Sequence, residues 1–570
     1  MGETSNTSFA GRLRVSVGGS QGYGTMYTLD GIQHYSPYDG VGLPLPFPDA
    51  LQEFTVETSG LTARNGRSAS VGAVTKSGTN EFHGDAFWFV RNDLFNARQY
   101  FAKKGSTLKR NQYGGTIGGP VLQNKLFFFG GYQGTITRQD PADTRSFVPT
   151  AKMMAGDFTD YASKACNKKA VTLKAPFVNN KIDPALFSPA AVSLAGRIPR
   201  STDPCGELTY GQREDIDLAQ LISRVDYEIS DSHSMFGRFI YDYDDRPSPL
   251  RAEPDFVLNS TQRSFNNHAT AFTFGVTSLF GGTTVNSFRI AASKTNVQRG
   301  GEEFFSANDL GIKNHYTYVP NFMTIVMGDG FNIGGRSVAR ARFRTTFLQI
   351  ADDVQLVKGN HQISFGVSLG HAHLVYRPTP NAPGIFEFDD GTTGLVLGDF
   401  LMGNLAEYRQ GAPTNNVLRQ TQISMYVQDV WQLTPRLTAN YGIRWAPNIP
   451  MRDQTNPVAA VMQFDLDKFK NGVVSKTYPN APAGLLYAGD TGYEQSNREV
   501  MLPNWTNFGP RLGLAWDVTG DGRTSLRASY GITTDEFPLR LRGGNSTGQA
   551  PFGNDIRMDS VRPSDCKPNK

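Results

Sequence analysis

The sequence predicts an all-β fold, a transmembrane antiparallel β-barrel, on three observations. Candidate strands alternate between apolar and polar residues. Short turns join these strands at one end, and long polar segments join them at the other. Glycine and aromatic residues are abundant, with 60 Gly, 38 Phe and 22 Tyr in 570 residues, as is typical of β-hairpins and of the aromatic girdles of membrane barrels.

The alternation is clearest in residues 437–445, which read LTANYGIRW. The apolar positions of this segment are Leu437, Ala439, Tyr441, Ile443 and Trp445. The residues between them are polar or small, and the same pattern recurs in residues 363–370, 511–518 and 525–532. A period of two predicts strands with two chemically opposite faces.

The candidate strands form consecutive pairs across short turns. One turn contains Asp521-Gly522, a dipeptide that strongly favours a two-residue hairpin connection. The chain contains about 13 such strands of about 9–14 residues, whereas a tilted transmembrane strand needs about 9–11. The strands are therefore long enough to cross a bilayer.

The connections at the other strand ends are long, polar and rich in Pro, Gly and Asn. They cover residues 92–111, 139–214, 247–263, 298–343, 377–417 and 449–507. Such lengths are unusual inside a compact soluble domain and normal on the outer face of a membrane barrel. A soluble β-sandwich is the alternative, but its loops would not be sorted by length between the two ends.

Composition and motifs disfavour several other classes of protein. No run approaches about 18 apolar residues, which excludes a transmembrane helix. The N-terminal segment lacks the apolar core of a signal peptide, so either the protein is cytoplasmic or its true N-terminus precedes this sequence. The net charge of +4 is too small to indicate nucleic-acid binding. No H-E-x-x-H motif occurs and no Ser/His/Asp grouping stands out, and we expect no enzyme activity, cofactor or metal.

The three cysteines do not form a disulfide scaffold or a metal-ligand spacing. Cys166 and Cys205 lie in one polar, Pro-rich segment, and Cys566 lies near the end of the sequence. In an oxidising compartment the first two could close a loop of about 40 residues. Two free thiols agree equally well with the sequence.

Residues 25–33, TMYTLDGIQ, and residues 47–80, which contain DALQEFTVET, ARNGRSA and AVTKSGTN, carry a family resemblance. They resemble the C-terminal half of the plug domain of TonB-dependent outer-membrane receptors, in particular the Oar-like subgroup. Later segments, among them NQYGGTIGGPV and VQDVWQLTPRLTANYGIRW, resemble the barrel wall of the same subgroup. The resemblance implies a barrel of about 22 strands around a luminal α+β plug.

The resemblance also divides the chain. Residues 1–80 are expected to form the C-terminal part of the plug, residues 81–535 the first strands of the barrel, and residues 536–570 an extracellular loop or truncated end. The first half of the plug and the TonB box do not appear, so we expect a fragment of a larger receptor or a truncated gene model. The family's V-x-R-G-P motif is replaced by Val56-Glu57-Thr58-Ser59-Gly60, so the substrate of better-known members cannot be carried over.

The resemblance implies active uptake across the outer membrane of a Gram-negative bacterium. The plug would move when pulled by the inner-membrane TonB–ExbB–ExbD complex, and the barrel would contact membrane lipid and lipopolysaccharide. The substrate would be an oligosaccharide, a peptide or a metal chelate. The alternative is a surface-exposed barrel that acts in adhesion or matrix contact without transport; a soluble β-rich binding protein is a third reading.

One plug segment, residues 32–47, matches by position an apical loop that faces the outside in the family. Its candidate substrate-binding residues are His34, Tyr35, Tyr38 and Asp39. Aromatic rings beside a carboxylate can bind a sugar or a peptide by stacking and hydrogen bonds. The alternative is a loop that only packs against the wall.

Charged residues of the plug are candidates for ion pairs with the wall. The plug residues are Glu57, Arg64, Arg67 and Lys76, and the wall residues are Asp85 and Arg91. The two wall residues alternate with Trp88 and Val90, which places them on the luminal face of the first strand.

Overall fold

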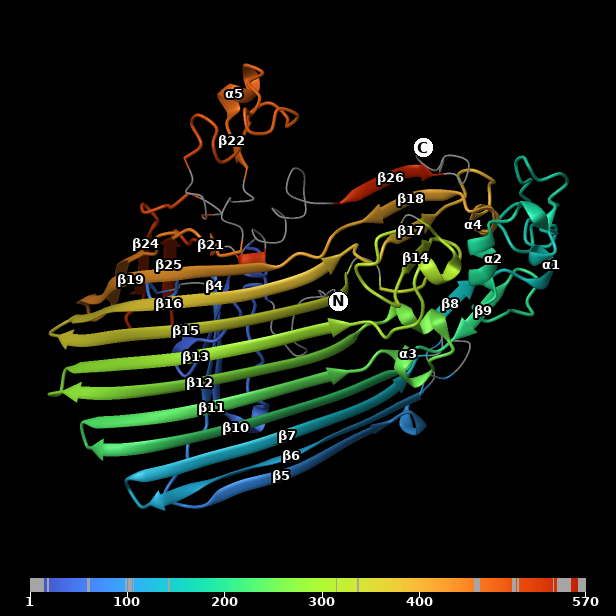
Figure 1. Cartoon of the computed structure of the whole chain (residues 1–570). Coiled ribbons are helices and arrows are strands. Elements are labelled where there is room, and N and C mark those ends of the chain that lie inside the picture. Colours follow the sequence, from blue (N-terminus) through green and yellow to red (C-terminus); the bar gives the residue numbers. More distant parts are fainter. Residues whose placement is uncertain are drawn as a thin grey trace.

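The computed structural model describes residues 15–561 except 18–19, 59–61, 98–99, 101–104, 106, 142–143, 314, 336–337, 456–461, 495–498, 500–501, 537 and 541–554. The described part of the chain forms a long curved antiparallel wall, a smaller sheet on its concave side, and a lobe at one end of the strands (Figure 1). Cys566 and most of residues 536–570 lie outside the described residues.

The wall consists of 13 strands that pair in chain order from β5 to β25, with β21 (Arg452–Asp453) attached to β19. They are β5 (His83–Asn92), β6 (Thr107–Leu122), β7 (Leu126–Asp140), β10 (Glu214–Ser230), β11 (His233–Arg246), β12 (Ser264–Phe280), β13 (Thr284–Gly300), β15 (Val338–Lys358), β16 (His361–Pro380), β19 (Asn416–Thr434), β20 (Leu437–Trp445), β24 (Phe508–Asp517) and β25 (Ser525–Gly531). All neighbouring pairs are antiparallel. The sheet stays open, with β5 and β25 as its edges.

The two faces of the wall are inverted relative to a soluble protein. On β24 the apolar residues Leu512 and Leu514 point outward and are 58% and 53% exposed. On the concave face, the polar residues Gln428 and Asp353 are 7% and 8% exposed. An apolar outer face and a polar interior are the pattern of a membrane barrel. The predicted all-β barrel class is confirmed.

The connections are sorted by length between the two strand ends, as the sequence predicts. The turns β6–β7, β10–β11, β12–β13, β15–β16 and β19–β20 contain two or three residues, and β24–β25 contains residues 518–524. The long connections all leave from the opposite strand ends (Figure 1). The two ends of the wall therefore face different surroundings.

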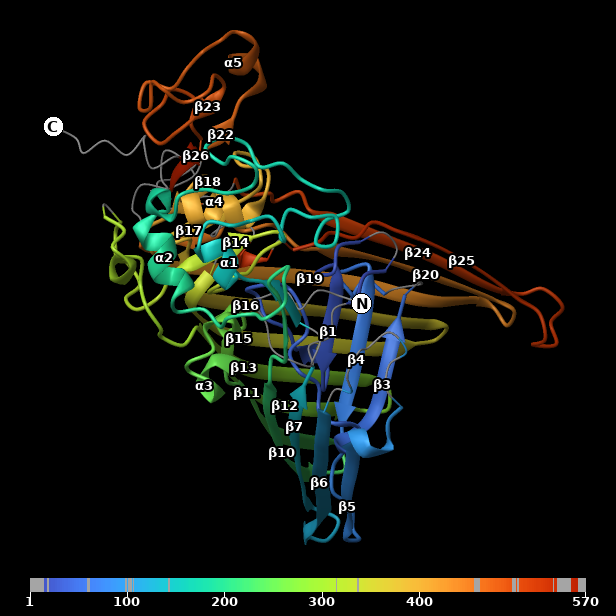
Figure 2. The ribbon, with the colours of Figure 1, turned by 90° about the vertical axis from the view of Figure 1, so that its right-hand side faces the viewer.

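The plug sheet lies against the concave face of the wall (Figure 2). Its strands are β1 (Thr25–Leu29), β2 (Ile32–Gln33), β3 (Leu51–Glu57) and β4 (Ala69–Thr75), in the order β2-β1-β4-β3 with β1 parallel to β4. The short helix η1 (Pro48–Ala50) precedes β3 and is the only helix in the described part of the plug.

Apolar side chains fix one flank of the plug to the wall. Leu29, Phe47, Ala50 and Ala73 of the plug form one buried cluster with Phe129, Ile222 and Ile240 of β7, β10 and β11. Gly131 of β7 makes room for the ring of Phe47, because a Cβ there would lie 2.8 Å from Phe47 Cζ. Burying these side chains removes apolar area from water and stabilises the seated plug.

The long connections fold onto one another as an outer lobe, defined as the described parts of residues 144–210, 249–261, 304–335 and 385–410. Its elements are β8 (Thr144–Phe147), α1 (Ala151–Met154), η3 (Pro184–Leu186), α2 (Pro189–Ala195), β9 (Glu207–Tyr210), α3 (Pro249–Ala252), η4 (Val257–Thr261), η5 (Asn308–Leu310), β14 (Thr324–Met327), β17 (Ile385–Phe388), α4 (Val396–Met402) and β18 (Leu405–Gln410). β26 (Ile556–Val561) adds to β18. Phe158, Leu258, Phe331 and Phe400, one from each segment, share one buried core.

The remaining elements are short. They are η2 (Asp93–Phe95) after β5, and β22 (Gln463–Phe464), α5 (Leu466–Lys470) and β23 (Leu485–Leu486) in an arm between β20 and β24. Among the described helices, none has the length and apolar character needed to cross a membrane.

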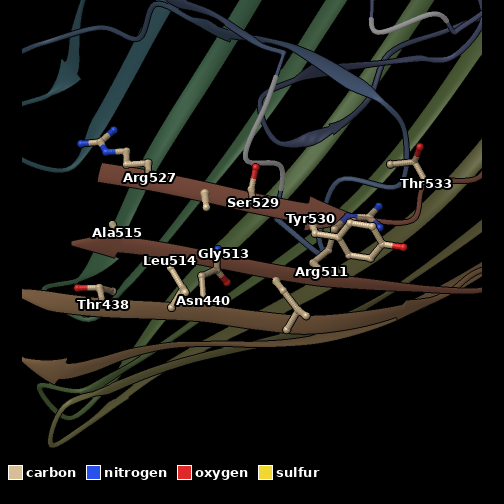
Figure 3. A pocket seen from close by; sticks show the side chains of 13 residues that line it. Thr438, Asn440, Arg511, Gly513, Leu514, Ala515, Arg527, Ser529, Tyr530 and Thr533 are labelled. Carbon is tan, nitrogen blue, oxygen red and sulfur yellow. The ribbon is translucent and has the colours of Figure 1, made fainter. Parts of the chain in front are cut away.

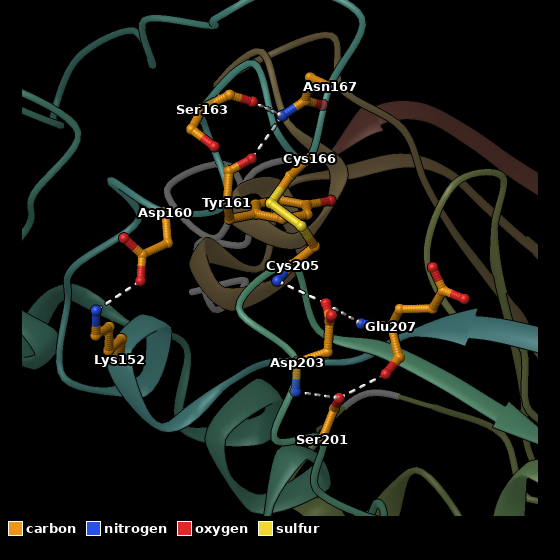
Figure 4. The surroundings of a disulfide bond; sticks show 10 residues. All are labelled: Lys152, Asp160, Tyr161, Ser163, Cys166, Asn167, Ser201, Asp203, Cys205 and Glu207. Atoms are coloured by element: carbon orange, nitrogen blue, oxygen red, sulfur yellow. Dashed lines mark hydrogen bonds and ion pairs between the residues drawn. A yellow bond between two sulfur atoms is a disulfide. The ribbon is translucent and has the colours of Figure 1, made fainter.

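A disulfide joins Cys166 to Cys205 in the outer lobe, with the sulfur atoms 2.03 Å apart (Figure 4). Cys166 packs against the core of the lobe. Asp203 accepts a hydrogen bond from the backbone N–H of Cys205 at 2.8 Å, and Lys152 pairs with Asp160 at 2.6 Å nearby. The bond closes a loop with a sequence separation of 39 residues.

Candidate functional site: the interface of plug and wall

A tight turn brings a carboxylate of the plug into the wall. Asp30 and Gly31 join β1 to β2 and have φ angles of 53° and 81°. Two successive positive φ angles are those of a type I′ hairpin turn, which Asp-Gly favours. The side chain of Asp30 is only 3% exposed.

Two arginines of the wall meet Asp30. Arg224 Nη1 lies 3.2 Å from Asp30 Oδ1, and Arg238 Nε lies 3.4 Å from Asp30 Oδ2. The backbone N–H of Thr75 donates to Oδ1 at 2.9 Å, and Arg289 Nε donates to the backbone oxygen of Asp30 at 2.9 Å. Buried charges persist only where they are paired and hydrogen-bonded, so this turn is an anchor between plug and wall.

A second cluster surrounds Asp353 of β15. Arg64 Nη2 of the plug lies 2.8 Å from Asp353 Oδ2, and Arg289 Nη1 lies 3.4 Å from the same oxygen. Tyr426 donates its hydroxyl to Asp353 Oδ1 at 2.7 Å. Arg64, one of the predicted ionic residues, thus pairs with a wall carboxylate, but with Asp353 rather than with Asp85.

The other predicted ionic residues lie in different surroundings. Arg67 Nη2 pairs with Glu536 at 3.2 Å, and Arg67 Nη1 donates to the backbone oxygen of Tyr23 at 2.9 Å. Glu57 accepts a hydrogen bond from Asn65 within the plug at 2.8 Å.

Asp85 accepts a hydrogen bond from Thr116 of the neighbouring strand at 2.5 Å. Within the described residues, no ion pair joins Lys76, Asp85 or Arg91 to an opposite charge. The structure does not bring these three together with the charges of the plug–wall clusters.

Sequence reasoning missed the glutamines of the wall. Gln428 accepts the backbone N–H of Ala63 at 2.6 Å, and Gln220 accepts that of Phe47 at 2.7 Å. Gln349 donates to the backbone oxygen of Gln33 at 2.9 Å. The sequence signal that could have found them is a glutamine at a position of the strand whose side chain faces inward.

The predicted apical residues are all buried. His34, Tyr35, Tyr38 and Asp39 are between 3% and 5% exposed. The ring of Tyr38 packs on Phe343 with centroids 5.1 Å apart, and the hydroxyl of Tyr35 donates to Gln422 at 2.9 Å. In this structure the loop packs against the wall, which is the alternative that the sequence left open, and substrate contact with these side chains remains a prediction that requires the loop to move.

His34 makes the seated plug sensitive to acid. Burial, followed by the charge of Arg238, lowers the pKa of His34 from 6.5 to about 4, and Nε2 hydrogen-bonds the backbone oxygen of Pro44 at 3.0 Å. The neutral ring therefore contributes stability that is fully present above pH 6.5 and is lost as the pH falls towards 4. The full loss is roughly 3 kcal/mol.

We expect the melting temperature of the wild-type protein to fall more steeply between pH 6.5 and 5 than that of His34→Gln, whose side chain does not titrate. Thermal melts of both proteins in the same detergent measure this difference. Equal slopes for the two proteins would contradict the assignment to His34.

A separate hollow of about 600 Å³ lies near the free edge of the wall (Figure 3). Its lining comes from β20, β24 and β25 and includes Asn440, Arg511, Arg527 and Tyr530. β25 is the last strand of the sheet, and the residues that line this hollow include no described residue of the plug. Within the described residues, no group of three or more His, Cys, Asp or Glu side chains could hold a metal ion.

A family profile described as "Outer membrane beta barrel domain" matches residues 74–568. The chain belongs to this outer-membrane β-barrel family. The match covers the wall and the outer lobe, and it agrees with the apolar outer face and the polar lumen of the sheet. The predicted location in the outer membrane of a Gram-negative bacterium is thereby confirmed.

Relatives of this β-barrel chain are transporters and receptors. The TonB-dependent transporter Oar of Myxococcus xanthus is 34% identical over 135 residues, which are 22% of this chain and 13% of that protein. The outer membrane transporter YddB of Escherichia coli superposes with a TM-score of 0.50 at 10% identity. The superposition covers 91% of this chain and 54% of the YddB chain. The ferric enterobactin receptor PfeA of Pseudomonas aeruginosa gives a TM-score of 0.44 at 13% identity, covering 91% and 55%.

The predicted resemblance to the Oar-like subgroup is confirmed by these findings. The β-barrel chain spans about half the length of the solved transporters and a smaller share of the Oar protein. At 10% identity, the likeness to the solved transporter concerns the fold alone.

Proposed function

We propose that the protein takes up a bulky substrate across the outer membrane, driven by the TonB–ExbB–ExbD complex through a segment outside this sequence. The observation that carries the proposal is the plug, a separate sheet inside the wall held mainly by side chains of the wall. Wall strands pair their backbone groups with one another and cannot open without breaking that ladder. The plug is therefore the part that moves. The substrate would be an oligosaccharide, a peptide or a metal chelate.

The resemblance to a TonB-dependent transporter supports this proposal over 135 residues. A second candidate, adhesion by a barrel without transport, is favoured by the outer lobe, because several connections share one core and present a folded surface. Both candidates place the lobe outside the cell and differ in their need for energy from the inner membrane.

The test is a chromosomal deletion of the gene in the source bacterium. Growth on single oligosaccharides, peptides and chelated metals as limiting nutrients is compared between the wild type, the deletion strain and a strain lacking TonB. We expect at least one nutrient to be lost in both mutants and restored by the intact gene. A deletion strain that grows normally on every nutrient but loses attachment to a surface would favour adhesion instead.

A further inference from the structure

Three polar hollows lie between the plug and one flank of the wall, and residues 62–67 of the plug, here named the latch loop, lie among them. We infer that the hollows form one passage and that the latch loop, rather than the whole plug, is its barrier. The inference rests on the proposed uptake of a hydrophilic substrate and names the route and the gate.

The hollows follow one another in depth along β19. The outer hollow, of about 300 Å³, is lined by Gln420 and Gln422 near the outer end of the strand. The middle one, of about 40 Å³, is lined by Ser424 and Tyr426, and the inner one, of about 410 Å³, by Tyr426, Gln428 and Val430. Met26 of the plug lines all three. Their sequence from outer to inner strand end makes them successive parts of one seam.

The narrowest part of the seam, at the middle hollow, is a cluster of charged and aromatic side chains. Arg64 lines the middle and inner hollows, and Arg444 lines the outer and middle hollows. Arg64 pairs with Asp353 at 2.8 Å, while Arg444 Nη1 donates to the backbone oxygen of Arg64 at 2.9 Å. These contacts close the small middle hollow from the plug side and from the wall side together.

The latch loop is attached to the wall by polar bonds, while Arg64 and Arg67 also donate to backbone oxygens of the plug. Gln428 accepts from the backbone of Ala63 at 2.6 Å, and Arg511 Nη2 donates to the backbone oxygen of Asn65 at 3.4 Å. Arg67 pairs with Glu536. The single hydrogen bonds from Gln428 and Arg511 exchange readily for bonds to water once the seam is wet, because the net contribution of each bond is small.

The opposite flank of the plug is held differently. There Leu29, Phe47 and Ala73 are buried against β7, β10 and β11. Apolar burial has no comparable exchange with water. The latch loop can therefore leave the wall while the rest of the plug stays seated.

The lining suits a hydrophilic solute. The outer hollow is lined by the side-chain amides of Gln33, Gln420, Gln422, Asn448, Asn504 and Asn507. Amide groups both donate and accept, and can replace the hydration of hydroxyl or amide groups on a moving chain. The two arginines of this hollow face Asp535 and Glu536 within the same lining, so no single sign of charge dominates it.

The experiment compares two glutamines that make the same bond on opposite flanks. Gln428→Ala releases the backbone of Ala63, and Gln220→Ala releases the backbone of Phe47. Each variant, together with Arg64→Ala and Arg64→Lys, replaces the chromosomal gene in a strain lacking TonB. Entry of vancomycin, a hydrophilic antibiotic that the intact outer membrane excludes, is measured as growth inhibition.

We expect Gln428→Ala and Arg64→Ala to increase sensitivity to vancomycin roughly threefold to tenfold, because each removes a bond that keeps the loop closed. Arg64→Lys, which keeps the charge, should restore most of the exclusion, and Gln220→Ala should leave exclusion intact. Equal leakage through Gln220→Ala would show that any loosening of the plug leaks and would overturn the inference. If both latch variants still exclude vancomycin while present in the outer membrane at wild-type amounts, the inference is overturned as well.

The leak assay needs neither TonB nor the natural substrate, so its outcome is separable from that of the uptake test. If the latch variants leak but the uptake test finds no TonB-dependent nutrient, the passage is supported and the proposed uptake is not. If a TonB-dependent nutrient is found but the latch variants do not leak, the proposed uptake is supported and the role of the latch loop is refuted. Amounts of each variant in the outer membrane are measured by immunoblot, which separates a closed passage from a missing protein.

Discussion

Replacing Asp30 with asparagine is expected to lower the stability of the seated plug by about 3–5 kcal/mol, because it leaves buried arginines without their counter-charge. Asparagine is the informative replacement. Asp30 has a positive φ of 53°, which asparagine tolerates, whereas alanine would add backbone strain of about 1 kcal/mol. Asparagine also retains an oxygen that can accept the N–H of Thr75.

The measurement is proteolysis of the purified protein in detergent, with the cleavage rate within residues 25–75 followed over a range of urea concentrations. Asp30→Asn should become cleavable at a lower urea concentration than the wild type, while the wall remains resistant. Glu57→Gln is the matched control, since Glu57 is an exposed plug carboxylate bonded only to Asn65 among the described contacts. It should behave as the wild type.

A second substitution tests the mechanism. Arg238 is 1% exposed and pairs with Asp30, whereas Arg224 also pairs with Asp226 at 2.8 Å. Adding Arg238→Met to Asp30→Asn removes the arginine that depends most on Asp30, so the double variant should recover part of the lost stability. No recovery would mean that the cost of Asp30→Asn comes from the turn itself.

The wall could be predicted from the sequence because its signal is local. In residues 437–445 the period of two is complete within one strand, and the structure places Tyr441 and Ile443 outward and Arg444 inward. The pairing of strands in chain order follows from the short turns. Neither inference needs information from a distant part of the chain.

The outer lobe could not be predicted in the same way. Each connection contributes only a few apolar residues, such as Leu258 or Phe331, and these find a core only when segments more than a hundred residues apart meet. The sequence therefore reads as long polar loops. The partner of Arg64 was missed for a related reason, because the depth and rotation of the plug decide which wall carboxylate it meets.

The Asp30-Gly31 turn lies between these cases. The dipeptide predicts a hairpin turn from sequence alone, but the arginines that surround the carboxylate lie on β10, β11 and β13. A buried ionic role follows only once the turn is seen against the wall. Local chemistry thus gives the shape of the anchor, and the tertiary fold gives its partners.

Breaking the bond between Cys166 and Cys205 is expected to destabilise the outer lobe by about 4 kcal/mol, from the entropy of a loop closed over a separation of 39 residues. The lobe has only short helices and strands of its own, so its order depends on a shared core that an open segment would leave. The wall should be unaffected, because its strands pair in an unbroken ladder outside the loop that the disulfide closes.

Protease added to intact cells measures this effect, because the proposed function places the lobe outside the cell. Cys166→Ser, Cys205→Ser and the double variant should each be cut faster within residues 144–210, and all three to the same extent, since each removes the same bond. Cys566→Ser is the control for loss of a thiol and should match the wild type. If a reductant accelerates cleavage of the wild type to the rate of the variants, the disulfide is the cause; if the double variant is as resistant as the wild type, the apolar core alone holds the lobe and the entropic argument is wrong.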